Sequence, residues 1–224
     1  TFTGTSLILT DGLSNQQTIA MTGTFTTSDV ILTTGAGATT VSLLCFCQGT
    51  VIDTPTGRTA VQNLRVGDRV MTASGAVRPI TWIGQASVAL RRGKRTDATP
   101  VLIRAGAFAP NVPFRDLRVT KGHAFYLDGA LIPVEFLINN RSILWDDNAS
   151  HETLFHIELD AHDIVLANGA PAESYRDDGN RPLFATQSHD AMPRHDPCAP
   201  ILLGGPVVDA VWARLLARAG TGSI

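Results

Sequence analysis

The sequence predicts an all-β protein that ends in one helix. Turn-forming residues recur about every ten positions after Thr50, with short runs of β-branched and aromatic residues between them, as in sandwiches and barrels of short strands. The dipeptides Asp128-Gly129 and Asn168-Gly169 each separate two apolar runs, where they predict tight two-residue hairpins. Helical spacing of apolar residues is convincing only over 206–219, so we expect a single C-terminal helix.

Composition narrows the class of protein. The chain has 224 residues, of which 44% are hydrophobic and 17% charged, a profile that suits a globular protein with a real core. A net charge of −2 gives no electrostatic reason to expect binding to nucleic acid or to an anionic membrane surface. No apolar run reaches the roughly 18 residues that a membrane span needs, and no signal peptide is visible.

The chain divides into three segments by composition. Residues 1–44 hold thirteen threonines and no Lys or Arg, and their short alternating runs at 6–9 and 29–33 predict a β-type upstream segment that is marginal on its own. Because residue 1 is Thr, we expect an internal cut of a longer protein, and the Thr-rich flank is compatible with an extracellular or cell-surface location. Residues 45–175 form the dense β domain, and 176–224 form an extension with the helix at about 206–219.

The strands of the β domain follow from alternating or continuous apolar runs between turn signals. We expect strands at 50–54, 69–72, 79–84, 100–103, 115–120, 123–127, 130–134, 154–159, 163–167 and 170–173. The basic run 91–95 is interpreted as a solvated loop, because five residues are too few for a nucleic-acid footprint.

Reactive residues are few. Three cysteines, an odd number, do not build a disulfide framework. Cys45 stands where the polar upstream segment ends, and Cys47 is either a second nucleophile or a buried thiol. We interpret His151 and His156 as structural. The remaining candidates for a metal site are irregularly spaced and predict none: His189, His195, Asp196 and Cys198.

An ordered set of motifs resembles one known family. Cys45 opens Cys-Phe-x-x-Gly-Thr, Thr120 and His123 form a Thr-x-x-His step, and His162 opens the stretch 162–169. Together with the segments 64–70, 82–84 and 156–159, these motifs resemble the Hint family, the self-processing domains of hedgehog proteins and inteins. The likeness covers about 45–175 and looks closest to bacterial hedgehog/intein-type domains. It implies a compact Hint-type β fold.

The resemblance also implies a chemistry. Cys45 would attack the carbonyl of Leu44, an N–S acyl shift that converts the Leu44–Cys45 peptide bond into a thioester. His123 would polarise that amide and protonate the departing nitrogen, Thr120 would hydrogen-bond the amide or fix His123, and His162 would have a supporting role. The substrate would be the upstream chain itself, and the thioester would be resolved by water or by a small-molecule or protein nucleophile. No cofactor or metal is implied.

The sequence departs from the family in two places. Splicing inteins end in His-Asn, where this chain has Glu173 and Ser174, and Ser cannot cyclise to a succinimide, so full splicing is not expected. The stretch 81–85 lacks the acid that hedgehog domains use in sterol transfer. One alternative is a catalytically silent structural or interaction domain of a larger secreted or surface protein. A multi-turnover Cys/His hydrolase is less favoured, because Cys45 does not lie at a helix N-terminus.

Overall fold

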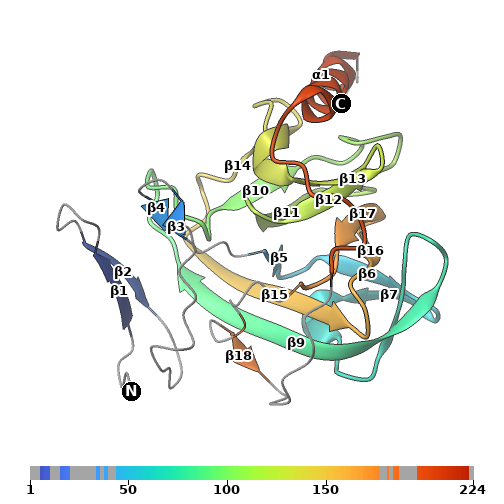
Figure 1. The fold of residues 1–224 in the computed structure, drawn as a ribbon, viewed down its shortest axis with the longest axis horizontal. Helices are drawn as coiled ribbons and strands as arrows, with labels where there is room; N and C mark the ends of the chain where they lie inside the picture. Colours follow the sequence, from blue (N-terminus) through green and yellow to red (C-terminus); the bar gives the residue numbers. More distant parts are fainter. Residues whose placement is uncertain are drawn as a thin grey trace.

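The computed structural model describes residues 6–10, 16–20, 34–35, 38–39, 44–176, 181, 184–186 and 196–221. It confirms an all-β architecture with one C-terminal α-helix (Figure 1). Two antiparallel sheets make up most of it. The first contains, in order, β14 (Ile143–Trp145), β10 (Pro100–Ile103), β11 (Leu117–Thr120), β5 (Phe46–Cys47), β15 (His151–Leu159), β9 (Val77–Ala89) and β18 (Ala185–Thr186), with β8 (Arg69–Met71) paired to β9.

The second sheet contains, in order, β13 (Ala130–Pro133), β12 (Ala124–Leu127), β17 (Ala170–Glu173), β16 (Ile164–Ala167), β6 (Val51–Thr54) and β7 (Gly57–Ala60). Short 3-10 turns follow β7 and β13, at η2 (Val61–Asn63) and η3 (Val134–Leu137). Upstream of the domain, β1 (Ser6–Thr10) pairs with β2 (Gln16–Ala20), and β3 (Thr34–Gly35) pairs with β4 (Ala38–Thr39). The strand expected at 29–33 lies outside the described residues.

The first sheet is organised around two long strands. β9 and β15 run side by side through the middle of the molecule (Figure 1), paired from His151 opposite Ala89 to Leu159 opposite Ile80. The short strand β5 lies between β15 and β11. It is held on both sides, with Phe46 opposite Phe155 on β15 and opposite Val119 on β11. The residue that precedes β5, Cys45, is therefore fixed in the interior of the sheet.

Both predicted hairpin turns are confirmed. Asp128 and Gly129 have φ of 50° and 84°, and Asn168 and Gly169 have φ of 48° and 80°. Positive φ at both central residues is the geometry of a type I′ turn, which matches the twist of the flanking strands and favours Asn-Gly and Asp-Gly. Asn168 also ties the turn to its surroundings, because its Oδ1 accepts a hydrogen bond from the Val51 N–H at 2.8 Å.

The predicted strands differ from those in the structure mainly in where they begin and end. The strand expected at 115–120 begins only at Leu117, because Asp116 instead accepts a hydrogen bond from the Ala105 N–H in a turn. The strand expected at 79–84 is much longer, since β9 continues to Ala89 along β15. Within the described ranges, no helix combines the length and apolar character of a membrane span.

The C-terminal extension docks on the β domain. The helix α1 (Pro206–Thr221), predicted over 206–219, buries Val208, Val211 and Leu215 in the main core, and it lies at the end of the molecule opposite β18 (Figure 1). Trp212 Nε1 donates to the Ile138 carbonyl at 2.9 Å. Before the helix, Ile201 forms a parallel bridge with Leu131 on β13, with Leu202 N–H donating to the Leu131 carbonyl at 2.9 Å.

Truncation of a buried helix residue tests this docking. Leu215 is 0% exposed, so we expect Leu215→Ala to lower the free energy of unfolding by about 3 kcal/mol through lost burial and a residual cavity. Leu203, which is 65% exposed and lies just before the helix, is the matched control, and Leu203→Ala should change stability by less than about 0.5 kcal/mol. Urea unfolding of both variants measures the difference. Equal effects would contradict the docking.

Candidate active site

The backbone of Cys45 is held by Thr120. Thr120 N–H donates to the Cys45 carbonyl at 3.0 Å, as expected for neighbouring strands. In the other direction the Cys45 N–H donates to the side-chain hydroxyl Thr120 Oγ1 at 2.7 Å, in place of a main-chain acceptor. Both residues are fully buried. The amide hydrogen of the Leu44–Cys45 bond thus points at a fixed hydroxyl, which is one of the two contacts expected for Thr120.

His123 lies on the other side of the same peptide bond. A turn after β11 brings its N–H to the Thr120 carbonyl at 3.0 Å, and its ring packs against Phe46 with centroids 4.2 Å apart. Burial lowers the pKa of His123 to about 4, although the charge of Glu173 and the backbone of Leu44 oppose this shift. A backbone group raises the pKa of an imidazole only as an acceptor, so the Leu44 carbonyl faces the ring. Neither ring nitrogen makes a hydrogen bond of regular geometry.

The thiol of Cys45 is enclosed by apolar side chains. It is 0% exposed, in a cluster that includes Trp82, Leu154, Tyr175 and Phe184. Burial raises the pKa of the thiol far above its ordinary value, because a thiolate is poorly solvated in these surroundings. The resting group is therefore a neutral thiol, and any attack by sulfur needs a nearby base.

Continuation of the β5–β15 pairing by one residue places His156 opposite Cys45. On β15, Leu154 is opposite Cys47 and Phe155 is opposite Phe46, so the next pair in this register is His156 with Cys45. Its ring centroid is 5.8 Å from that of His123 and 4.7 Å from that of Tyr175. Its interpretation as a structural residue missed this juxtaposition, which depends on the pairing of strands far apart in sequence. No local motif marks it.

His162 belongs to a separate contact set. Its Nδ1 accepts a hydrogen bond from the Cys198 N–H at 3.0 Å, and its Nε2 lies 3.6 Å from Glu173 Oε2. Burial lowers the pKa of His162, but Cys198 and Glu173 together raise it above its usual range. Its polar partners are therefore Glu173 and Cys198, not Cys45. A supporting role for His162 remains a prediction.

Glu173 is better integrated than the sequence suggested. It is buried, and its Oε1 accepts a hydrogen bond from the Ala124 N–H at 2.8 Å. Burial raises the pKa of the carboxyl, but His162, the charge of His123 and further contacts lower it overall, so Glu173 is a buried anion. Next to it, Ser174 Oγ accepts a hydrogen bond from the Asp163 N–H at 3.0 Å. These contacts are structural ties, and the sequence offered only a mismatch with inteins at this point.

The other two cysteines differ in exposure. Cys47 is buried near Cys45, and burial followed by the charge of Glu152 raises the pKa of its thiol. Cys198 is exposed, and no disulfide links the three. In the part of the chain that the structure describes, no group of His, Cys, Asp and Glu is arranged to hold a metal ion. Of the weaker metal candidates, His189 and His195 lie outside that part.

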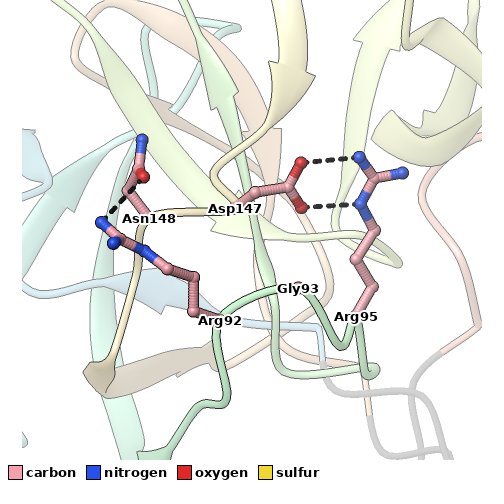
Figure 2. Close-up of a pocket in the computed structure, with 5 residues that line it drawn as sticks. All are labelled: Arg92, Gly93, Arg95, Asp147 and Asn148. Carbon is pink, nitrogen blue, oxygen red and sulfur yellow. Dashed lines mark hydrogen bonds and ion pairs between the residues drawn. The ribbon is translucent and has the colours of Figure 1, made fainter.

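A surface hollow lies beside the basic run, away from the residues just described. Figure 2 shows it lined by Arg92, Gly93, Arg95, Asp147 and Asn148. Arg95 makes two hydrogen bonds of 2.7 Å to the Asp147 carboxylate, and Arg92 donates to Asn148 at 3.2 Å. The charges of Arg95 and Asp147 are paired with each other, whereas Arg92 donates to the uncharged Asn148.

The buried histidines predict a loss of stability in mild acid. His123 has a folded pKa of about 4 and an unfolded pKa of about 6.5, so between these values protons bind the unfolded chain more strongly. We expect His123 alone to lower the free energy of unfolding by about 2 kcal/mol between pH 7 and pH 5. His156, whose pKa burial also lowers, acts in the same direction. His162, whose pKa is raised in the folded chain, has the opposite effect on stability. The stabilisation that it adds is complete below pH 6.5 and is lost as pH rises above that value.

Urea unfolding at pH 7 and pH 5, in a Cys45→Ala background that prevents cleavage, measures this effect. His123→Gln should flatten the pH dependence, whereas His151→Gln, at an exposed position on β15, should leave it unchanged. A wild-type stability that does not fall towards pH 5 would contradict a buried neutral His123.

Residues 44–179, more than half of the chain, match the family model of the Hint domain. No curated protein matches the chain. Among solved structures, the gp41-1 intein is 13% identical, with 58% of this chain and 98% of that chain covered and a TM-score of 0.42. The bacterial intein-like domain from Clostridium thermocellum is 15% identical, with 60% and 100% covered and a TM-score of 0.42. On the family match, this chain belongs to the Hint domain family of self-processing domains.

Proposed function

We propose that the chain cleaves itself once at the Leu44–Cys45 peptide bond, by an N–S acyl shift that makes a thioester on Cys45. The observation that carries this proposal is that side chains contact both ends of this one peptide group. Its N–H donates to Thr120 Oγ1 at 2.7 Å, and its carbonyl side faces His123. An ordinary buried strand residue has no need of a side-chain acceptor and an imidazole at the same peptide group.

The attack draws on proximity. The Cys45 thiol is connected through its own backbone to the carbonyl carbon of Leu44, so the reaction is intramolecular and has a high effective molarity. As sulfur adds, negative charge develops on the Leu44 oxygen. A neutral His123 carries one N–H, and donation of that hydrogen to the oxygen would stabilise the charge in a water-free site. Thr120 keeps the amide plane in place during the attack.

Protonation of the departing nitrogen needs a second group or a prior proton transfer. A neutral imidazole is a very weak acid, and the low pKa of His123 means that it carries no spare proton at neutral pH. His123 therefore suits polarisation of the carbonyl better than direct donation to nitrogen. His162, held by Glu173 and Cys198, would support the site by joining β17 to the C-terminal extension.

Attack on the thioester would separate the upstream segment from Cys45, and the C-terminal cleavage that splicing requires would not follow. Ser174 stands where splicing inteins have Asn. Its hydroxyl accepts a hydrogen bond from the Asp163 N–H, and it has no side-chain amide that could cyclise. Water, or a small-molecule or protein nucleophile, would release or transfer the segment 1–44. The reaction is a single turnover on the chain's own upstream segment, with no cofactor.

A silent structural or interaction domain is the second candidate. The observation in its favour is burial: Leu44 is 6% exposed and Cys45 is 0% exposed, and burial raises the pKa of the thiol. Such a site excludes the water or nucleophile that would resolve a thioester. Self-cleavage of the fresh chain separates the two candidates.

Intact-mass spectrometry of freshly purified chain tests the cleavage. We expect a fragment that begins at Cys45, formed faster with dithiothreitol or hydroxylamine, because both attack a thioester far faster than an amide. Cys45→Ala should abolish the fragment. Cys47→Ala is the matched control for the neighbouring thiol and should still cleave. If folded wild type stays intact for days with either nucleophile, the chain is a silent domain.

Thr120 offers a graded test. Thr120→Val keeps the shape of the side chain but removes the hydroxyl that accepts the Cys45 N–H, so we expect cleavage to slow by roughly tenfold or more, the value of one buried hydrogen bond. Thr120→Ser should stay close to wild type. Thr59→Val, on β7, is a control for a Thr in a strand away from Cys45. Cleavage by Thr120→Val at the wild-type rate would remove Thr120 from the mechanism.

A further inference from the structure

We propose that His156 is the proton-transfer residue of the acyl shift, taking the proton from Cys45 Sγ and returning it to Cys45 N. This inference rests on the proposed cleavage at Leu44–Cys45 and assigns the base that the buried thiol requires. His156 belongs to none of the sequence motifs that suggested chemistry for Cys45, Thr120 and His123.

Strand register places His156 beside the thiol. The pairs Leu154–Cys47 and Phe155–Phe46 continue to His156–Cys45, and the Gln48 N–H bond to the Thr153 carbonyl, 2.9 Å, keeps the same register at the other end. Directly opposite residues of an antiparallel pair point to one face, with Cβ atoms about 4.5–5.5 Å apart. Tyr175 and Phe184 contact the His156 ring and also belong to the cluster around Cys45, which agrees with this placement.

The second observation is that His156 has unused polar atoms. It is 0% exposed, and in the described part of the chain neither Nδ1 nor Nε2 makes a hydrogen bond. A buried polar atom without a partner costs about 1–3 kcal/mol, and such atoms in native structures call for an explanation. A core position among Trp82, Tyr175 and Phe184 would be filled more stably by an apolar ring. A role in proton exchange with the neighbouring Cys45 thiol would explain why an imidazole occupies this position.

The surroundings of His156 keep its ring unprotonated in the resting site. Burial lowers its pKa, and repulsion from the protonated forms of His123 and His162 and from Arg176 adds to the shift, so the resting ring is neutral. The two buried rings near the scissile bond then have different tasks. His123 lies by the Leu44 carbonyl, whereas the strand register places His156 opposite Cys45.

The step balances without an outside reagent. The Cys45 S–H bond breaks and its proton moves to a ring nitrogen of His156 as the Sγ–C bond to Leu44 forms. The imidazolium, which burial destabilises, then gives the same proton to Cys45 N as the C–N bond breaks. The products are a Leu44–Cys45 thioester, a free amine on Cys45 and a neutral His156.

The test compares cleavage rates of the full 224-residue chain as wild type, His156→Phe and His156→Gln, in hydroxylamine from pH 6 to pH 9. Removal of the proton-transfer group should slow the cleavage by at least 10²-fold at pH 7, the usual contribution of general acid–base catalysis. The log rate of both variants should then rise by about one for each pH unit, because hydroxide must remove the thiol proton. Wild type should level off. His151→Phe, at the exposed end of the same strand, is the matched control and should behave as wild type.

The outcomes distinguish failure of the role of His156 from failure of the cleavage at Leu44–Cys45. Wild type that cleaves, together with a folded His156→Phe or His156→Gln that cleaves within threefold of it and shares its pH profile, overturns the role of His156 and leaves the cleavage in place. Wild type that never cleaves refutes the cleavage itself. Circular dichroism identifies which variant is folded, and a folded His156→Gln decides if His156→Phe does not fold.

Discussion

The hydrogen bond from the Cys45 N–H to Thr120 Oγ1 is the contact on which the rest of the site depends. It lies where β5 begins, and β5 is only two residues long, so the strand is held chiefly by its neighbours β11 and β15. The turn after β11 brings His123 to the Leu44–Cys45 peptide group, and the register of β15 places His156 opposite Cys45. Loss of that bond would leave a buried amide hydrogen without an acceptor and would loosen the short strand on which both rings converge.

Burial and charge act in opposite directions on the histidines around this peptide group. His123 and His156 are completely buried and neutral, because removal from water penalises the imidazolium form. His162 has a carboxylate neighbour, Glu173, which favours its protonated form. The region therefore combines two neutral rings with a third, His162, that lies beside a carboxylate. Glu173 is the only buried carboxylate among their named partners, and it balances positive charge that the apolar surroundings could not otherwise accommodate.

Local signals explain what was predictable from the sequence. The turns at Asp128-Gly129 and Asn168-Gly169 were predicted because positive φ at two adjacent residues strongly restricts residue choice, and α1 was predicted because its buried face repeats at helical spacing. The Thr-x-x-His step at Thr120 and His123 was visible because one turn joins its two members. The neighbour of Cys45 on β15 was not visible, since it depends on how strands more than a hundred residues apart align. The contacts of Glu173 were not visible for the same reason, because its partners come from β12 and from the loop before β16.

The bridge between Ile201 and Leu131 has a consequence beyond the docking of α1. β13 is an outer strand of the six-stranded sheet, and an outer strand with open N–H and C=O groups is a template for pairing with another chain. Here the segment that leads into α1 occupies that template: Leu131 N–H donates to the Pro200 carbonyl at 2.8 Å, and its own carbonyl accepts from Leu202. The C-terminal extension thus covers part of the open edge of this sheet. With these groups of Leu131 occupied, β13 offers fewer open N–H and C=O groups with which another chain could pair.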